Sequence, residues 1–382
     1  MQLENFDIEL FLRDYWQQKP LLIKNPWQEW INPLDPDELA GLACEEEVES
    51  RLVIQQRPQW KVEHGPIPEA RFATLPKAEW TLLVQAVDHF VPDVADLLDA
   101  FRFIPNWRID DVMVSYAAEN GGVGAHFDQY DVFLIQGLGT RRWQIGALCD
   151  ETTPLLPHDE LRLLARFKAT EEWLLEPGDI LYLPPRYAHN GVAVSEDCMT
   201  YSVGFRAPAR GDLVANFCDY VLGTLTDDDR YSDPGLAAAK NSGEISAEAL
   251  KNLQQMVADK LLDADSFRSW FGCYSTSRKY VDDDIKPEKA LTTSQLLKHL
   301  QRGEILLRNP TSRFAFVRDD DRIQLFVDGE PQNFAPALNN FVETLCANTI
   351  VATDTDLLNS SATIELLTAL FNQGSLVFAD DD

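Results

Sequence analysis

The sequence has few basic residues for its length. Its 33 lysines and arginines stand against 62 aspartates and glutamates, so the formal charge is −29. Phosphate backbones would repel a protein this acidic, and we therefore expect no direct binding of nucleic acid. The excess of acid leaves two interpretations: the protein meets a basic partner, or its surface charge only keeps it soluble.

Other absences narrow the class further. The six cysteines are scattered and form no Cys-x-x-Cys pair, which argues against a disulfide framework or a zinc ribbon. No run approaches the roughly 18 apolar residues of a transmembrane helix, so we expect no membrane association. The segment 1–7 has neither the basic nor the apolar stretch of a secretory signal. With free thiols, this predicts a cytoplasmic protein.

The 382 residues suffice for two or three domains, and the sequence pattern changes along the chain. Residues 1–207 contain short segments rich in β-branched and aromatic residues, punctuated by glycine and proline, which predicts an antiparallel sandwich or barrel. The predicted strands cover residues 109–117, 131–136, 142–145, 180–183 and 199–205. Residues 80–102 instead show helical periodicity.

The remainder of the chain suggests two further domains. Residues 208–287 are predicted to be helical, because apolar residues recur at helical spacing over 213–225 and 249–262. So few helices cannot bury two apolar faces by themselves and must pack on the first domain or on a partner chain; of these, we expect a homodimer interface. Residues 288–382 combine short helices with a hairpin pattern at 314–327, which favours a winged-helix-like domain. It is acidic, so we expect it to contact proteins rather than DNA.

The strongest chemical signal is the motif His126-Phe127-Asp128. In a strand, residues two apart point to the same side, so this imidazole and carboxylate can face one point. His189 follows a predicted strand and a Pro-Pro turn, and it can supply a third ligand. Two histidines and a carboxylate on one face of an octahedron are typical of non-haem Fe(II) oxygenases. A His-x-Asp pair can also arise by chance in an acidic chain, but the glycine-rich turn before it favours a metal site.

Arg141 is the candidate for binding an anionic ligand beside the metal. It begins the strand after the metal motif, where it shares a face with Trp143 while Arg142 faces the other way. An arginine in that place can bind the far carboxylate of a dicarboxylate with two hydrogen bonds. The alternative is a surface arginine paired with a nearby acid, and we assign that role to Arg142.

Together these residues resemble the Jumonji-C family of Fe(II)- and 2-oxoglutarate-dependent oxygenases, and within it the bacterial ribosomal-oxygenase branch. The most specific match is the run Gly-Gly-Val-Gly-Ala-His-Phe-Asp-Gln-Tyr-Asp-Val-Phe, and the others lie at residues 15–23, 50–53, 107–111, 176–185 and 201–208. The resemblance implies a mainly β catalytic domain with a double-stranded β-helix (cupin-type jelly roll) fold. An all-α dimerisation region and an α+β winged-helix-like domain would follow it.

The resemblance also implies the site and the reaction. His126, Asp128 and His189 would hold Fe(II), and Arg141 would bind 2-oxoglutarate, which is used together with O₂. Ala117 departs from the family pattern, which has a cosubstrate-contacting serine at this position, so one hydrogen bond is missing here. Members of the branch hydroxylate an arginine of large-subunit ribosomal protein L16 at its β-carbon and release succinate and CO₂.

The residues that bind the substrate are less clearly marked in the sequence than the metal ligands. An arginine side chain would want a carboxylate or an aromatic clamp. Asp110, Asp111, Tyr130 and Asp131 are candidates because they lie close to the predicted metal and cosubstrate residues in the sequence. The acidic surface would attract a basic ribosomal protein and repel assembled ribosomal RNA. We therefore expect action on the free protein, before assembly.

Two other functions stay open at this point. A Jumonji-C-type N-methyl-lysine demethylase would apply the same iron chemistry to an N-methyl carbon, and the three metal ligands do not distinguish it from a hydroxylase. A catalytically silent cupin would instead scaffold an assembly through its acidic surface. The complete set of metal-ligating residues and the arginine argue against that second alternative.

Overall fold

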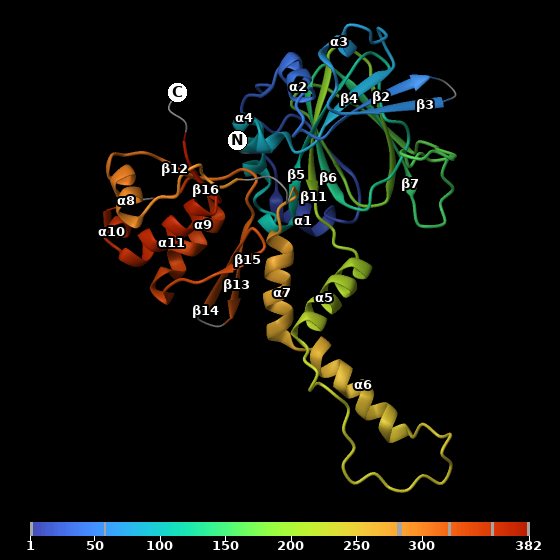
Figure 1. The fold of residues 1–382 in the computed structure, drawn as a ribbon. Coiled ribbons are helices and arrows are strands. Elements are labelled where there is room, and N and C mark those ends of the chain that lie inside the picture. The colour runs from blue at the N-terminus through green and yellow to red at the C-terminus, as the bar shows by residue number, and fades with distance from the viewer. Residues whose placement is uncertain (1–2, 57–58, 281–284, 320–321, 353–354, 380–382) are drawn as a thin grey trace. The chain divides into compact units, whose positions relative to one another are not determined.

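The computed structural model describes residues 3–56, 59–280, 285–319, 322–352 and 355–379 (Figure 1). No helix within these ranges is long and apolar enough to cross a membrane. Strands dominate residues 1–207, and most helices follow them.

Two antiparallel sheets form the framework of residues 1–207. The larger sheet has eight strands in the order β1 (Leu21–Ile23), β9 (Ile180–Leu183), β6 (Asp131–Leu138), β11 (Cys198–Phe205), β5 (Ile109–Ala117), β4 (Trp80–Val84), β2 (Ser50–Gln56) and β3 (Gln59–His64). The smaller sheet has three, in the order β10 (Tyr187–Ala193), β7 (Arg141–Leu148) and β8 (Glu171–Leu175). The crossing order of the strands, with β9 and β11 in one sheet and β10 in the other, confirms the predicted double-stranded β-helix.

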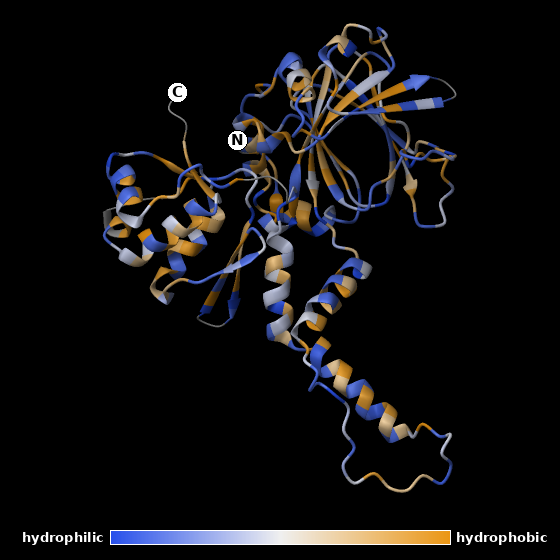
Figure 2. Ribbon diagram, viewed as in Figure 1, coloured by the Kyte–Doolittle hydropathy of each residue, from blue (hydrophilic) through white to orange (hydrophobic). Residues whose placement is uncertain are grey.

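Strand β6 shows how the core is divided into two layers. Val132 and Leu134 pack with Trp143 of β7 in a cluster between the two sheets. Phe133 and Ile135 point to the other face of the large sheet and join a second, larger core. Side chains alternate between the faces of a strand, so a strand with both faces covered is apolar throughout. Figure 2 shows orange, hydrophobic stretches along the strands of the first unit.

Short helices contribute to the larger core. They are α1 (Ile8–Asp14), α2 (Pro36–Leu42), α3 (Glu69–Phe72) and α4 (Pro92–Ala95), with three 3₁₀ turns at Val87–His89, Asp96–Phe101 and Asn106–Arg108. Helix α1 begins at its N-cap Asp7, whose carboxylate accepts from the backbone N–H of Leu10 at 2.9 Å. Its Phe11 is 1% exposed and packs edge-on to the ring of Tyr182 in β9.

The helical prediction for residues 80–102 is wrong over its first part. Trp80–Val84 is strand β4, which pairs with β5 on one side and β2 on the other. Four of its five residues are buried, so apolar side chains occupy both faces. Because a fully buried strand has no polar face, its pattern cannot be told from that of a helix by spacing alone.

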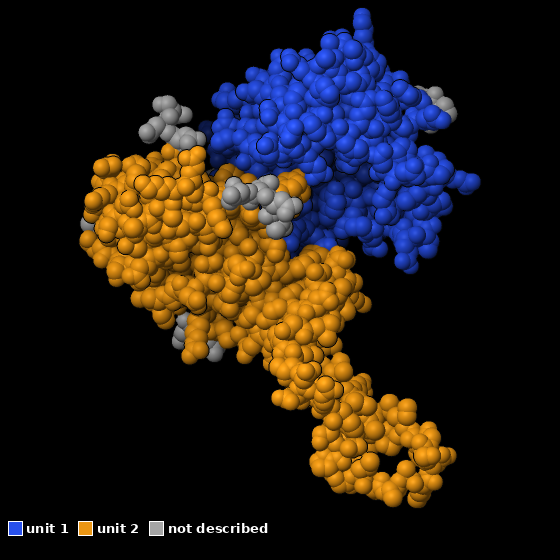
Figure 3. Space-filling model, in the orientation of Figure 1, with its two compact units in different colours: residues 1–207 blue, residues 208–382 orange. Residues whose placement is uncertain are grey.

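A second compact unit comprises residues 208–382, and the first comprises residues 1–207 (Figure 3). It starts with α5 (Arg210–Thr224), α6 (Ala247–Leu261) and α7 (Ala264–Thr276), which confirms the predicted helical region. Phe217 and Val221 of α5 pack on Trp270 of α7 in a small core. Helix α6 buries no residue at all.

The rest of this unit has a core of its own. Its elements are α8 (Thr293–Gln301), β12 (Leu306–Arg308), β13 (Phe314–Asp319), β14 (Arg322–Val327), β15 (Glu330–Gln332), a 3₁₀ turn at Pro336–Leu338, α9 (Asn339–Ala347), α10 (Thr355–Leu358), α11 (Ser361–Asn372) and β16 (Leu376–Phe378). The predicted hairpin is present as β13 and β14, although residues 320–321 of its turn lie outside the described ranges. The boundary predicted between residues 287 and 288 stays a prediction.

Candidate metal centre

His126 and Asp128 lie on the loop between β5 and β6, not on the strand that the sequence predicted. Glycines allow this loop to lie directly against β10. A Cβ on Gly122 would come within 2.4 Å of the carbonyl oxygen of Gly191, and Gly124 has a φ of +83°. A larger residue would clash or be strained at these positions. The side chains of His126 and Asp128 are therefore positioned by contacts between the backbone of this loop and β10, and not by the alternation of side chains along a strand.

Reciprocal hydrogen bonds join the loop to the strand that carries the third candidate ligand. The backbone N–H of His126 donates to the carbonyl of His189 at 3.0 Å, and the reverse bond measures 2.8 Å. The centres of the two rings are 4.3 Å apart. The carbonyl of Asp128 accepts from the N–H of Arg186 at 2.7 Å. These bonds bring together residues that are 63 positions apart in the chain.

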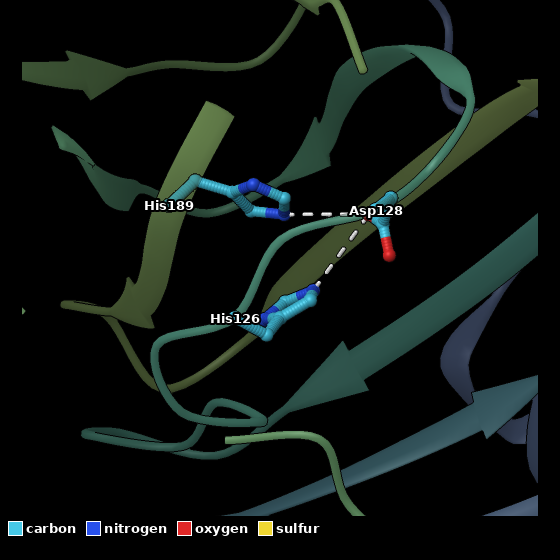
Figure 4. A group of neighbouring side chains, drawn as sticks. All are labelled: His126, Asp128 and His189. Atoms are coloured by element: carbon cyan, nitrogen blue, oxygen red, sulfur yellow. Dashed lines mark ion pairs between the residues drawn. The ribbon is translucent and has the colours of Figure 1, made fainter. Parts of the chain in front are cut away.

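The three side chains converge on one point (Figure 4). The Oδ2 atom of Asp128 lies 3.9 Å from Nε2 of His126 and 3.6 Å from Nε2 of His189. All three potential ligand atoms lie within 4.8 Å of one another, and no other such group occurs among the described residues. Two histidines and one carboxylate form the donor set of the facial-triad Fe(II) sites. These residues therefore fit a divalent iron ion.

Both histidines are held in the tautomer that a metal requires. Nδ1 of His126 lies 2.9 Å from the carbonyl oxygen of Gly124, and Nδ1 of His189 lies 2.9 Å from that of Tyr187. A carbonyl only accepts, so each Nδ1 carries the proton and each Nε2 presents its lone pair to the centre. Burial, aided by the neighbouring His126, lowers the pKa of His189 to about 4 against the opposing effect of Asp128. The His189 ring is thus neutral near pH 7, as a ligand must be.

Arg141 begins β7, the strand that pairs with β10. In this ladder Arg141 lies opposite Ala193, while Ile145 lies opposite His189. The Trp143 ring lies between them, 5.8 Å from the Arg141 guanidinium and 5.9 Å from the His189 ring. Arg141, the candidate for binding the cosubstrate, and His189, a candidate metal ligand, therefore lie on neighbouring strands of the small sheet, with the indole of Trp143 close to both.

The Arg141 guanidinium is buried without an acidic partner. Only 5% of the residue is exposed, and no carboxylate of the described ranges lies within ion-pair distance of it. Nε donates to the sulfur of Cys198 at 3.4 Å, whereas the buried Nη2 has no hydrogen-bond partner in the described part of the chain. A buried charge left uncompensated costs several kcal/mol. The guanidinium is therefore suited to receive an anionic ligand.

Ala117, at the end of β5, contributes no polar atom to this region. It is fully buried and packs with Ala193 and Cys198 in a small cluster. In the β5–β11 ladder Ala117 lies opposite Cys198. The structure thus places Ala117 in the group of residues around Arg141, and a serine there would have carried its hydroxyl into this group.

Tyr130 lies within electrostatic reach of Asp128 and of two other candidate substrate contacts, Asp111 and Asp110. Tyr130 is 45% exposed, yet partial burial and the carboxylates of Asp128, Asp111 and Asp110 raise the pKa of its hydroxyl. Asp111 is 2% exposed and accepts from the amide of Gln85 at 2.7 Å. The Tyr130 ring therefore has acidic groups around it, one of them the candidate metal ligand Asp128, which suits a cationic side chain.

Asp131 has a different environment. It is fully buried, and the Tyr182 hydroxyl donates to its Oδ1 at 2.6 Å. Its Oδ2 accepts from Arg108 at 3.2 Å and from Gln17 at 2.9 Å. Both carboxylate oxygens are used inside the protein, so the contacts favour a structural role for Asp131 over contact with a substrate.

Sequence reasoning missed the contribution of Cys198 and Gln136. The amide of Gln136 donates to the same sulfur that receives Nε of Arg141. No motif marks either residue, because their proximity depends on the register between β6, β11 and β7. From the sequence alone, a cysteine in a strand cannot be distinguished from any other small, buried apolar residue.

Comparison with known proteins supports this arrangement. A model of the JmjC domain matches residues 96–213, and a model of the ROXA-like winged helix matches residues 251–377. The chain is 37% identical over 372 residues to the ribosomal protein uL16 3-hydroxylase of Escherichia coli K12, covering 96% of each chain. It is 38% identical over 278 residues to a probable ribosomal oxygenase of Haemophilus influenzae, covering 70% of this chain and 67% of that protein.

Solved structures show the same likeness at the level of the whole fold. An X-ray structure of E. coli YcfD is similar with a TM-score of 0.90 and 36% identity, covering 99% of this chain and 100% of that one. A structure of YcfD, a ribosomal oxygenase, in complex with cobalt and 2-oxoglutarate has a TM-score of 0.88, 35% identity and 99% coverage of both chains. The relatives thus share both units of the chain.

Proposed function

The chain belongs to the JmjC-domain ribosomal oxygenase family, and from this premise we propose that it is an Fe(II)- and 2-oxoglutarate-dependent hydroxylase of a ribosomal protein. Its substrate is an arginine of a protein of the uL16 type, hydroxylated at the β-carbon. The observation that carries this proposal is the buried, unpaired guanidinium of Arg141 on the same sheet as a His-Asp-His group.

Each residue of the site has a defined task. When bound, Fe(II) with 2-oxoglutarate and O₂ supplies the hydroxylation of a C–H bond, with release of succinate and CO₂. His126, Asp128 and His189 would hold the iron, and their Nδ1 hydrogen bonds fix the direction of both imidazoles. Arg141 would bind the far carboxylate of the cosubstrate. Selectivity then depends on where the protein holds the substrate side chain.

Tyr130, Asp111 and Asp110 are the proposed contacts of the substrate arginine. Tyr130 supplies a partly exposed ring, and the two aspartates supply negative charge near that ring. A guanidinium can stack on the ring and bond to a carboxylate at once.

The charge of −29 supports a basic protein as substrate and opposes ribosomal RNA. We therefore place the reaction on the free ribosomal protein, before assembly and in the cytoplasm. An acidic surface speeds encounter with a basic chain and disfavours other partners.

The test of this function is an intact-mass measurement on the substrate. The purified protein, loaded with Fe(II) and given 2-oxoglutarate, ascorbate and air, is incubated with the free uL16 protein or with assembled large subunits. We expect a gain of one oxygen on one arginine of the free protein, and much slower modification of the subunits. Faster turnover of assembled subunits would contradict the order of events proposed here. Loss of a methyl group with formaldehyde would indicate a demethylase, and absence of succinate a silent cupin.

Helix α6 supports the proposed homodimer. Its apolar residues Leu250, Leu253 and Val257 are 56%, 40% and 59% exposed, and Leu261 continues the same stripe. These positions are three or four apart, so they lie on one face of the helix. A fifteen-residue helix that buries nothing within its own chain requires a cover. A second copy of this chain supplies a matching apolar face by symmetry.

The double variant Leu253→Glu/Val257→Glu is expected to be monomeric. Two buried charges at the centre of an apolar interface would cost several kcal/mol unless they were paired. Light scattering behind a sizing column reports the mass of each variant at micromolar concentration. Asn252→Glu/Gln255→Glu adds the same charge on the opposite face of α6, where both residues are exposed, and should leave the dimer intact. Equal masses for the two variants would refute this interface.

A further inference from the structure

The arginine proposed to bind the cosubstrate is held by a sulfur atom. Nε of Arg141 donates to Sγ of Cys198 at 3.4 Å, and Cys198 is fully buried. The same sulfur accepts from Nε2 of Gln136, also at 3.4 Å. Sulfur is a weak acceptor, but a charged donor strengthens the bond.

The far end of this chain of contacts is also fixed. Nε2 of Gln136 donates to the carbonyl oxygen of Leu138 at 2.7 Å, and its Oε1 accepts from the hydroxyl of Thr200 at 3.2 Å. Gln136 and Thr200 are almost completely buried and lie on neighbouring strands β6 and β11. The amide of Gln136 therefore has little freedom to turn, and it defines the place of the Cys198 sulfur.

Two alanine methyl groups also pack in the cluster that contains the sulfur. Cys198 lies opposite Ala117 in the β5–β11 ladder, and Arg141 lies opposite Ala193 in the β7–β10 ladder. The two alanines and Cys198 form one fully buried cluster. A methyl group accepts no hydrogen bond, so within this cluster the acceptor for Nε of Arg141 is the sulfur.

We propose that Cys198 is a positioning residue for cosubstrate binding: held by Gln136, its sulfur fixes the Nε edge of Arg141 and leaves the unpartnered Nη2 for the ligand carboxylate. The guanidinium is planar, so fixing one edge sets the direction of the others. The family pattern has a serine at position 117. Here that position is Ala117, and the polar atom is supplied instead by Cys198, which lies opposite Ala117 in the ladder. The inference rests on the proposed role of Arg141.

The test measures cosubstrate affinity separately from turnover. Isothermal titration calorimetry, under nitrogen and with Mn(II) in place of iron, gives the Kd of 2-oxoglutarate for the full-length protein. Cys198→Ala should raise this Kd about tenfold, as expected for losing one hydrogen bond to a charged group. The kcat for uL16 at saturating 2-oxoglutarate should stay within about twofold, because the metal ligands and substrate contacts are untouched.

Two further variants separate the hydrogen bond from packing. Cys198→Ser keeps an acceptor in a smaller side chain and should keep most of the affinity. The exchange variant Ala117→Ser/Cys198→Ala moves the polar atom back across the ladder, and it should recover a Kd within about threefold of the original. Cys44→Ala is the matched control, since the Cys44 thiol donates to the backbone carbonyl of Ala40 and makes no hydrogen bond with Arg141 or Gln136 among the described residues. Melting temperatures without ligand verify that each variant is folded.

The outcomes distinguish this inference from the function on which it rests. An unchanged Kd in Cys198→Ala, or a Kd in Cys198→Ser as high as that of Cys198→Ala, overturns the positioning role of the sulfur. The proposed function survives that result if Arg141→Ala still loses binding. If Arg141→Ala binds 2-oxoglutarate as well as the original protein does, the cosubstrate role of Arg141 fails and the inference fails with it.

Discussion

Replacing Asp128 by alanine is expected to abolish both metal binding and hydroxylation. Asp128 is the anionic member of the group, and its Oδ2 lies within 4 Å of Nε2 of both histidines. Two neutral imidazoles alone neither neutralise nor enclose a divalent ion. Losing an outer hydrogen-bond partner of a metal ligand typically costs about 10–100-fold, so loss of a ligand should exceed about 100-fold in affinity and in succinate formation. Metal content after anaerobic loading and succinate yield provide the two measurements.

The fold should survive this substitution. The Asp128 side chain is 23% exposed, and the bond from Arg186 uses the backbone carbonyl of Asp128 and not its carboxylate. Asp93→Ala removes the same charge from an exposed position in α4 and should change neither metal content nor activity. If the Asp128→Ala protein still formed succinate at the original rate, the assignment of His126, Asp128 and His189 as the metal ligands would be refuted.

Replacing Arg141 by alanine is expected to raise the Kd of 2-oxoglutarate by at least about 30-fold. Truncating one partner of a buried charge pair costs about 2–5 kcal/mol, and each 1.4 kcal/mol is about tenfold in affinity. Lysine at this position keeps the charge but loses the two-pronged geometry, so Arg141→Lys should recover only part of the affinity. Titration calorimetry with the Mn(II)-loaded protein measures all three values.

Thermal unfolding adds a second readout for Arg141. In the described structure the guanidinium has no acidic partner, so its removal breaks no ion pair within the protein. Relief of this uncompensated buried charge offsets the packing that is lost on truncation, so we expect a small net change in Tm without ligand, whereas the rise in Tm that 2-oxoglutarate produces should disappear. Arg142→Ala, one residue along and on the other face of β7, is the matched control and should keep the full ligand-induced shift. A ligand-induced shift in Arg141→Ala equal to that of the original protein would contradict this role.

Strands could be predicted from the sequence where a run of β-branched and aromatic residues is bounded by turn residues. The predicted strands of the first unit correspond to β5, β6, β7, β9 and β11 because short β-branched and aromatic runs between turns are typical of strands. β10 was not predicted, although it carries His189, because it mixes tyrosine, histidine, asparagine and glycine. A strand of that composition is recognised only through its partner, β7, and through the loop that lies against it.

The sequence by itself determined the donor set of the site: two histidines and an aspartate in settings of glycine and proline, and an arginine two positions before a tryptophan. These patterns involve residues close together in the chain, so they can be recognised without knowing the fold. Only the tertiary structure decided what each donor faces. The bridge between His126 and His189, the carbonyls that fix their tautomers and the sulfur on Arg141 all join distant segments. Such contacts depend on strand register, which is set by the packing of the whole sheet.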